Sequence, residues 1–386
     1  MENLGLKFKA GDATAVLIWT DSIIPPNPEY IKKLTPWKII NRIPKINVLC
    51  KKVPLSILLN IAKSHFPELY SFYPQTFILP RDEKQFMTVL KSTTSDFLIK
   101  PDAGSFGNGI RIVNSKSKVY PTTTSSVAQE YIKSFLINNT KFDLRIYVLI
   151  ASITPLRVYI YRDGLCRFCS LKSNLKSRYS RITNVALNRN ANGTKIEDTS
   201  RLISDVFPEL SSNGVDVSSI WSEIDDIVLL TIISSYKYLK QAVDEELPTN
   251  SFSRCFQILG FDILLDENLK PHILEVNYRP SLEYYRGVER RMKVEMIQDA
   301  IRIAGPYETI QNCILSRKWC WTRSLWNKFI TENQQIISEI KERRKYALEN
   351  SKYVKIWPNK KKKEKYQNVI DKILSLDLDE VVNDVK

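Results

Sequence analysis

The chain has 386 residues, of which 43% are hydrophobic and 10% aromatic, enough to form a packed core in two or three lobes. With 11 glycines and 18 prolines it is neither collagenous nor broadly disordered. Because no run of 18 apolar residues occurs and Met1–Ala10 lacks an apolar signal core, neither a membrane span nor secretion is expected. The net charge of +15 predicts an acidic partner, which can be nucleic acid, an anionic membrane surface or a polyacidic protein tail.

Four regions are predicted, over residues 1–95, 96–190, 191–304 and 305–386. The first mixes a strand-like run at Ala15–Trp19 with a helical stretch around Leu55–Lys63. The second is rich in strand patterns. The third contains helices and a hairpin, and the fourth has the pattern of helices rich in Lys and Arg.

A short apolar strand ends at Lys100, and a glycine-rich loop containing Phe106 and Gly107 follows it. Backbone N–H groups of such a loop can approach phosphates closely, and a lysine can neutralise phosphate charge. The segment lacks the Gly-Lys-Ser/Thr of a Walker A loop, and its lysine precedes the loop, unlike the protein-kinase order. A plain hairpin turn is the alternative interpretation.

The next strand runs into a linker at Gln129, Glu130, Tyr131 and Ile132. Backbone groups of such a linker can pair with an adenine edge, and a plain strand end is the alternative.

Alternation along the strand Lys141–Ile150 places Lys141, Asp143 and Arg145 on one face and apolar residues on the other. A nucleotide offers matching groups, because ribose hydroxyls suit a carboxylate and phosphates suit cations. The alternative is a solvent-facing strand whose charges pair with one another.

Six cysteines in a chain of this length are expected to be reduced thiols. Cys166 and Cys169 form a CxxC motif without a second pair nearby. A zinc or redox site is therefore weighed against two small apolar residues in a strand.

Apolar residues at helical spacing predict a buried helix near residues 220–240 and a second helix over Glu289–Ile303. Between them, two β-rich runs flank a polar turn and predict a hairpin. With a four-residue loop over residues 267–270, Asp266 pairs with Pro271, and Asp262 then lies opposite Glu275.

Asn277 shares a face with Glu275, because side chains alternate along a strand. Two carboxylates directly across a strand pair repel each other unless a cation lies between them. Carboxylate and amide oxygens are ligands that Mg²⁺ accepts. The hairpin therefore predicts a magnesium site at Asp262, Glu275 and Asn277, with a solvated hairpin edge as the alternative.

The stretch Lys341–Lys365 holds eleven Lys or Arg residues against three Glu. An acidic protein surface is a natural counterpart to this excess. A disordered solubilising tail and a nuclear-import-like run are the alternatives. Nucleic acid is not the expected partner, since no DNA- or RNA-binding motif occurs.

Taken in chain order, these segments resemble the tubulin tyrosine ligase-like family within the ATP-grasp enzymes. The strongest matches are Ile99–Pro101, Gln129–Ile132, Lys141–Leu149, Tyr161–Phe168, Thr183–Asn184 and Leu259–Leu282. The resemblance implies an α+β ATP-grasp fold in which two α+β lobes (96–190 and 191–304) enclose the nucleotide. A small N-terminal α/β lobe precedes them and a basic helical extension follows.

The resemblance also implies a role for each matching residue. The implied nucleotide-binding residues are Lys100, Phe106, Gly107, Gln129, Glu130, Tyr131, Ile132, Lys141, Asp143, Thr183 and Asn184. The implied metal ligands are Asp262, Glu275 and Asn277. Arg167 and Lys293 resemble the family's residues for the incoming amino acid, and Arg145, Arg167 and Glu275 are the implied catalytic residues.

The implied activity is an ATP- and Mg²⁺-dependent ligation of glutamate to glutamate side chains of tubulin tails through an acyl phosphate. A glycine or tyrosine ligase of the same family is one alternative, and a non-catalytic microtubule-binding protein is another. The expected protein is a monomer that uses L-glutamate, binds microtubules but neither nucleic acid nor membrane, and works in the cytoplasm on the cytoskeleton, including cilia or basal bodies.

Two places depart from the family pattern. Phe106 and Asn108 stand where the family usually carries basic residues beside its loop glycines, and Arg181 and Val185 flank Thr183–Asn184 where the family has His and Tyr. The lysines and the metal residues match, which predicts an active enzyme.

Overall fold

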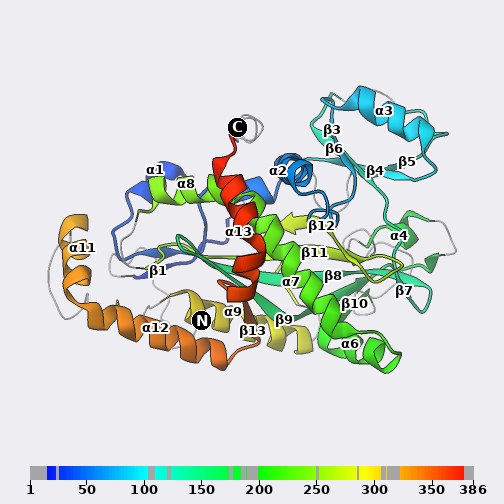
Figure 1. The fold of residues 1–386 in the computed structure, drawn as a ribbon. Coiled ribbons are helices and arrows are strands. Elements are labelled where there is room, and N and C mark those ends of the chain that lie inside the picture. The colour runs from blue at the N-terminus through cyan, green and yellow to red at the C-terminus, as the bar shows by residue number, and fades with distance from the viewer. Residues whose placement is uncertain are drawn as a thin grey trace.

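The computed structural model describes residues 15–22, 26–102, 109–119, 123–173, 177–183, 188, 199–248, 252–284, 287–305, 310 and 322–377. The expected α+β class is confirmed, because two antiparallel sheets and their covering helices form separate layers (Figure 1). Within this part of the chain, no helix combines the length and apolar character needed to cross a bilayer.

The larger sheet is antiparallel throughout. Its main path runs in the order β10 (Ser200–Leu202), β9 (Leu156–Phe168), β8 (Thr140–Ile153), β11 (Gln257–Leu265) and β12 (Pro271–Asn277). Two further strands extend it: β7 (Leu136–Ile137) pairs with β8, and β13 (Tyr353–Trp357) pairs with β9. Every residue of β8 after Thr140 is buried, so this strand is covered on both faces.

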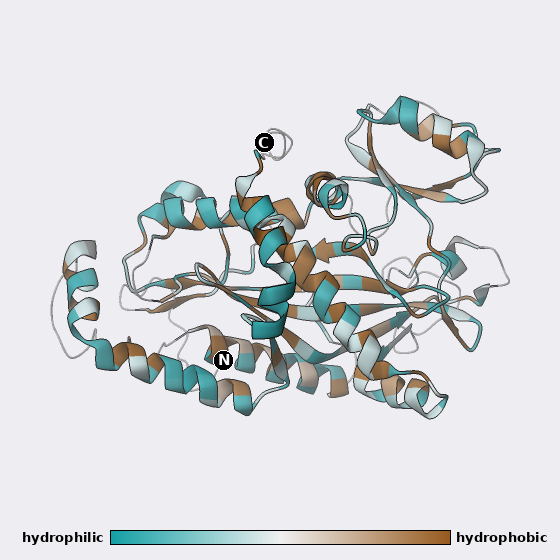
Figure 2. Ribbon diagram, viewed as in Figure 1, coloured by the Kyte–Doolittle hydropathy of each residue, from teal (hydrophilic) through white to brown (hydrophobic). Residues whose placement is uncertain are grey.

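Helices cover both faces of this central sheet. One face packs against α6 (Ile203–Ser212), α7 (Val217–Ser234), α8 (Tyr236–Glu246) and α13 (Lys360–Ser375). The other packs against α9 (Gly287–Ala304), α11 (Arg323–Glu332) and α12 (Gln334–Glu349). Alternation along β8 explains this, since Ile146 and Val148 belong to the first core and Tyr147 and Leu149 to the second. Hydrophobic residues accordingly concentrate on the central strands, while α13 turns mainly hydrophilic residues outward (Figure 2).

A smaller sheet stands beside the central one with a core of its own (Figure 1). Its order is β3 (Thr76–Leu79), β6 (Ser126–Glu130), β4 (Phe97–Pro101) and β5 (Arg111–Val113). Helix α3 (Glu83–Ser92) packs on it through Phe86, whose ring lies 5.6 Å from that of Phe77 and 5.4 Å from that of Phe97. We call this unit the small lobe.

The N-terminal segment joins the two sheets. It contains β1 (Leu17–Ile18), α1 (Pro28–Lys32), β2 (Ile39–Ile40), the 3₁₀ helix η2 (Ile46–Leu49) and α2 (Lys52–His65). Asp102, at the end of β4, accepts a hydrogen bond from the backbone N–H of Val53 in the first turn of α2 (2.9 Å). That contact satisfies one of the free N–H groups of the helix start and ties α2 to the small lobe.

Most predicted elements are present, with two differences. Helices α2 and α9 confirm the predictions around Leu55–Lys63 and Glu289–Ile303, together with the hairpin β11–β12. The helix predicted near 220–240 is instead two helices, α7 and α8, on either side of Ser235. The hydroxyl groups of Ser234 and Ser235 donate to the carbonyls of Thr231 and Ile232, which favours an end to the helix there.

The tail differs from a purely helical extension. Helices α11, α12 and α13 are present, but β13 lies between the last two and forms part of the central sheet. Its residues Tyr353, Ile356 and Trp357 are buried. The tail is therefore part of the folded body. The four predicted domains stay a prediction, and the small lobe combines strands from either side of residue 95.

Candidate active site

The hairpin β11–β12 pairs Asp262 with Glu275, as the sequence predicts. The predicted four-residue loop is wrong, however. Leu265 pairs with Pro271, and the backbone N–H of Asp266 donates to the carbonyl of Lys270 at 2.9 Å, so the loop is the three residues 267–269. Leu269 closes it with a φ of 64°, the left-handed conformation typical of three-residue hairpin loops. A bulge between Asp262 and Ile263 then shifts the register by one residue, which restores the pairing of the two carboxylates.

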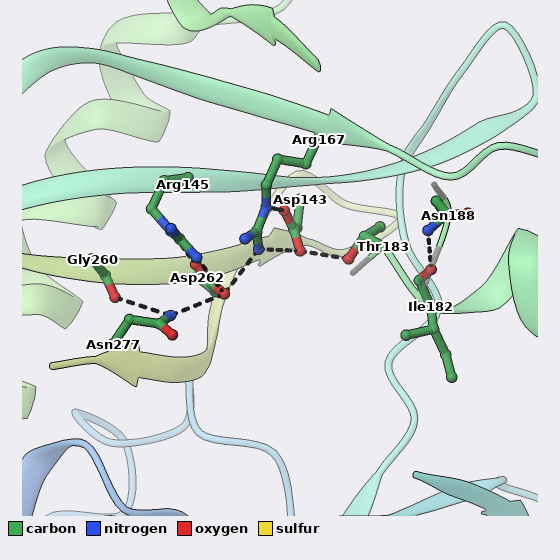
Figure 3. Close-up of polar contacts among 9 residues, drawn as sticks. All are labelled: Asp143, Arg145, Arg167, Ile182, Thr183, Asn188, Gly260, Asp262 and Asn277. Atoms are coloured by element: carbon green, nitrogen blue, oxygen red, sulfur yellow. Dashed lines mark hydrogen bonds and ion pairs between the residues drawn. The ribbon is translucent and has the colours of Figure 1, made fainter. Parts of the chain in front are cut away.

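Asp262 lies between two arginines from neighbouring strands (Figure 3). The guanidinium of Arg145 on β8 donates two hydrogen bonds to Asp262, from Nε to Oδ1 at 2.6 Å and from Nη2 to Oδ2 at 3.2 Å. Arg167 on β9 places Nη2 2.8 Å from Asp262 Oδ2. Burial alone would raise the pKa of Asp262, but the two guanidinium groups outweigh burial and hold it well below its usual range. The cations that Asp262 contacts are therefore side chains of the protein.

The same network continues to Asp143. Arg167 donates from Nε to Asp143 Oδ1 at 2.6 Å and from Nη2 to Oδ2 at 2.7 Å, and Thr183 Oγ1 donates to Asp143 Oδ2 at 2.5 Å. Asn188 holds the segment before Thr183 by donating to the carbonyl of Ile182 at 2.8 Å (Figure 3). The face of β8 that carries Asp143 and Arg145 is thus buried, which contradicts the alternative of a solvent-facing strand.

Glu275 faces the other side of this cluster. Lys52 Nζ lies 3.8 Å from its Oε2. Burial, and then the negative charge of Asp262, raise the pKa of Glu275. Asn277 completes the predicted group of metal ligands, with Nδ2 3.2 Å from Asp262 Oδ2. The side chains of Asp262 and Glu275 supply carboxylate oxygens and that of Asn277 an amide oxygen, which are hard donors of the kind that Mg²⁺ takes. These residues therefore fit a divalent cation.

Lys100 from the small lobe reaches the same place. Its Nζ donates to Gln129 Oε1 at 2.7 Å, and Gln129 Nε2 donates to Thr76 at 3.1 Å. Burial lowers the pKa of Lys100 to about 8, and the positive charges of Lys52 and Lys141 act in the same direction, against Glu275. A cavity of about 270 Å³, its open mouth included, is lined by Lys52, Lys100, Gln129 and Glu275 among others. It lies between residues of the small lobe and of the hairpin, and we call it the interlobe cavity.

Sequence reasoning missed Lys52 as a site residue. The signal was present, because Lys51-Lys52 directly precedes an apolar helix within a stretch that matches the family. The side chain starts at the first residue of α2 and lies beside Glu275 and Lys100 in the interlobe cavity. A cation at this position is suited to a phosphate ligand.

The linker after β6 is held by two cations. Lys141 Nζ lies 4.1 Å and the Arg181 guanidinium 4.5 Å from the centre of the Tyr131 ring, and Arg181 also forms an ion pair with Asp96. The backbone N–H of Tyr131 donates to the carbonyl of Asp96 at 2.8 Å. The departure at Arg181 is therefore accommodated by a specific contact with Asp96.

Glu130 and Ile132 are the other two residues of the linker that follow Gln129. Glu130 accepts from Ser95 Oγ at 3.2 Å, away from the Lys100–Gln129 pair, and its N–H donates to the carbonyl of Gln75 at 2.9 Å. Ile132 is half-buried. Pairing of the linker with adenine stays a prediction, and two of its N–H donors are already engaged within the protein.

Lys293 on α9 lies on the Arg145 side of the cluster. It is 4% exposed and donates to the carbonyl of Glu283. Burial lowers its pKa, and the charge of Arg145 adds to this. Phe106, Gly107 and Asn184, which complete the predicted nucleotide site, lie outside the described residues, as do the departures at Asn108 and Val185.

The antiparallel central sheet, the small lobe and the cavity between them define an α+β protein of the ATP-grasp type. The family model described as "Tubulin-tyrosine ligase family" matches residues 31–313. This chain belongs to that family.

Curated relatives agree with this assignment. The chain is 36% identical over 305 residues to mouse (Mus musculus) "Tubulin polyglutamylase TTLL11", covering 69% of this chain and 42% of the relative. It is 34% identical over 309 residues to zebrafish (Danio rerio) "Tubulin polyglutamylase ttll6", covering 77% and 39%. A "Probable beta-tubulin polyglutamylase" of Tetrahymena thermophila is 31% identical over 320 residues, covering 78% and 27%. The chain thus spans less than half the length of these relatives.

Proposed function

We propose that this protein is an ATP- and Mg²⁺-dependent ligase that adds glutamate to glutamate side chains of tubulin C-terminal tails. The observation that carries the proposal is the convergence of Lys52, Lys100 and Glu275 in the interlobe cavity. The names of the relatives support the substrate, and the net charge of +15 is complementary to an acidic tail.

The nucleotide would lie between the lobes. Lys52, Lys100 and Lys141 are proposed to supply the positive charge for its phosphates, and Asp143 with Thr183 to bind the ribose. Asp262, Glu275 and Asn277 would hold Mg²⁺, which when bound neutralises phosphate charge and polarises the phosphoryl group. The buried Arg145 and Arg167 keep Asp262 ionised, so a ligand carboxylate is ready at neutral pH.

The proposed reaction has two steps. First, an acceptor carboxylate oxygen bonds to the terminal phosphorus as the bond to the ADP oxygen breaks, giving an acyl phosphate. The α-amine of the incoming amino acid then bonds to the acyl carbon, phosphate leaves, and the amine loses a proton. Negative charge develops in both steps, and fixed cations such as Arg145 and Lys100 stabilise it without reorganisation.

The incoming amino acid carries a carboxylate, which Arg167 and Lys293 are proposed to hold. The basic run Lys360–Lys363 begins α13, and three of its four side chains are exposed. It is proposed to contact the acidic microtubule surface, which places the activity on the cytoskeleton.

The test is incubation of the purified chain with microtubules, ATP, Mg²⁺ and one amino acid at a time, with tail masses read by mass spectrometry. Addition of glutamate residues is expected, and none is expected from Glu275→Gln. Addition of glycine or tyrosine alone would reassign the amino acid. No addition of any amino acid, by a chain that binds microtubules, would refute the ligase and favour the non-catalytic alternative.

A further inference from the structure

The imidazole of His272 lies between two hydrogen-bond acceptors. His272 is on β12, three residues before Glu275, and its Nδ1 lies 3.0 Å from the carbonyl oxygen of Phe72. Its Nε2 lies 3.1 Å from Asp266 Oδ2, at the turn of the same hairpin. The ring therefore contacts the hairpin on one side and, on the other, the connection between α2 and β3. We call this arrangement the His272 bridge.

Both contacts need a donor on the ring. A carbonyl oxygen only accepts, so Nδ1 must carry a proton to bond with Phe72. Asp266 is an acceptor as well. Burial alone would raise its pKa, but hydrogen bonds from His272 and from two backbone N–H groups of the turn lower the pKa of Asp266, so this carboxylate is ionised at neutral pH. Neutral imidazole has one donor and one acceptor, whereas imidazolium has two donors, so the bridge is complete only with a protonated ring.

The elements packed around the ring carry other charged groups. Lys270, in the turn, pairs with Glu223 on α7 at 2.6 Å. On the side of α2, Lys63 Nζ donates to the carbonyl of Tyr73 at 2.9 Å. A third segment is joined to the turn by the bridge between Ser134 and Asp266, and its Lys133 is exposed. Because Glu223 is engaged by Lys270, Asp266 is the carboxylate that favours a charged ring.

The His272 bridge joins two walls of the interlobe cavity. Tyr73, next to Phe72, lines the cavity, and its hydroxyl forms a hydrogen bond with Ser56 Oγ on α2 at 2.8 Å. Glu275 lines the other wall, about 10 Å along β12 from His272. The separation of Tyr73 from the hairpin is therefore set in part by the contact between His272 and the Phe72 carbonyl. A neutral ring would donate to only one acceptor and turn a lone pair toward the other, which would release one contact of the bridge.

We propose that His272 is a positioning residue for the ligation reaction, and that as an imidazolium it holds Glu275 and Tyr73 at their working separation. This inference rests on the proposed function, since it names a residue that prepares the same cavity. His272 contacts no substrate in this role. Its contribution is present while the ring is protonated and is lost as the pH rises and the ring becomes neutral. A histidine that only packed in the strand would need no charge, because a neutral ring suffices to donate to Asp266.

The first test follows the full chain by NMR, so it decides the matter even if variants at His272 fail to fold. The chain contains two histidines, and His65 is exposed at the end of α2. Ring-labelled histidine therefore gives two sets of signals, which a His65→Gln sample assigns, and a Tyr73→Phe sample assigns the amide signal of Tyr73. As the pH is raised, this amide signal is expected to shift with the same midpoint as the His272 ring. A Tyr73 signal that stays unchanged while the ring loses its proton would overturn the proposal.

The second test compares kcat for ligation across pH between the wild type and His272→Gln, whose amide cannot donate to both acceptors at once. Where the ring is protonated, the wild type should be about 3- to 10-fold faster, the usual net worth of one hydrogen bond, and the ratio should approach one as the pH rises. Titration of Lys100 affects both proteins and cancels in the ratio. His65→Gln is the matched control and should equal the wild type at every pH. A ratio that does not change with pH would refute the proposal.

His272→Arg supplies the converse variant, because a guanidinium stays charged and donates in two directions. It should remain faster than His272→Gln at alkaline pH, where the wild type loses its advantage. An arginine variant no faster than the glutamine variant at any pH would count against a charged bridge. If the wild type adds no amino acid but the Tyr73 signal still follows the His272 ring, the ligase is wrong and the bridge stands.

Discussion

Arg167 Nη2 lies 2.7 Å from Asp143 Oδ2 and 2.8 Å from Asp262 Oδ2, so a single guanidinium joins two buried carboxylates from two other strands. Asp143 is 2% and Asp262 3% exposed. In the proposed enzyme the first faces the ribose and the second the metal. Arg167 therefore couples the two halves of the nucleotide site, in addition to its predicted role toward the amino acid.

Removing that guanidinium should destabilise the fold. Arg167→Met leaves Asp143 without its bidentate partner and Asp262 with Arg145 alone, and breaking a buried pair typically costs about 3–5 kcal/mol. Urea unfolding followed by circular dichroism measures the loss. Arg81, which is exposed and pairs with Asp82, supplies the control, since Arg81→Met should change the free energy of unfolding by less than about 1 kcal/mol. A similar small loss for both variants would contradict the network.

Glu275→Gln should separate activity from stability. Burial, and then the negative charge of Asp262, raise the pKa of Glu275. The neutral amide therefore removes both a desolvation cost and a repulsion, and the free energy of unfolding should stay the same or rise. Ligation should fall by ~10²-fold or more, as for other groups that act on developing charge. Thermal unfolding and tail mass spectrometry provide the two readouts. A variant with full activity would remove Glu275 from the site.

Nucleotide binding should take up a proton at alkaline pH. The pKa of Lys100 is about 8 in the free protein because burial disfavours its charge, and a bound phosphate restores that charge and raises the pKa. Uptake is therefore expected at a pH just above that value and should vanish well below it, where Lys100 is already protonated. Calorimetry with ATP in buffers of different ionisation enthalpy measures it. Lys100→Met should abolish the uptake, whereas the exposed Lys84→Met should retain it.

The tail strand should be required for the fold. Tyr353 is 2% exposed and its ring lies 5.0 Å from that of Tyr161 on β9. Tyr353→Ala is expected to cost about 3–5 kcal/mol by analogy with other buried aromatics. Val354, one residue further along and 41% exposed, is the matched control, and its alanine variant should be nearly neutral. Chemical unfolding of both variants decides whether the tail is part of the body.

Much of the site could be predicted from sequence because its signals are local. Alternation along Lys141–Ile150 was enough to place Asp143 and Arg145 together, and the hairpin brought Asp262 opposite Glu275. The latter prediction is correct for a partly wrong reason, since the shorter turn and the bulge cancel. Leu269 closes the turn, and Leu274 is the residue left unpaired by the bulge between Asp262 and Ile263. Leucine is not a residue type that indicates a left-handed turn or a bulge.

The missed features depend on contacts between distant segments. Nothing near Tyr353 indicates that its partner is Tyr161, because strand pairing across such a separation leaves no periodic signal. Lys52 was missed because its role depends on how α2 meets β12. From the sequence, Arg145 and Arg167 were assigned to bind ligands. Only the register of β9, β8 and β11 shows that they form ion pairs with Asp143 and Asp262.

The pairing of β13 with β9 has a consequence for synthesis on the ribosome. The edge of β9 at Val158–Tyr161 is complete only when Tyr353–Trp357 has emerged, so it stays open while all the intervening residues are made. An unpaired edge flanked by large aromatic side chains is a template for pairing with other nascent chains. Early termination before Tyr353 would therefore yield an aggregation-prone product, and chaperone demand should peak just before β13 appears.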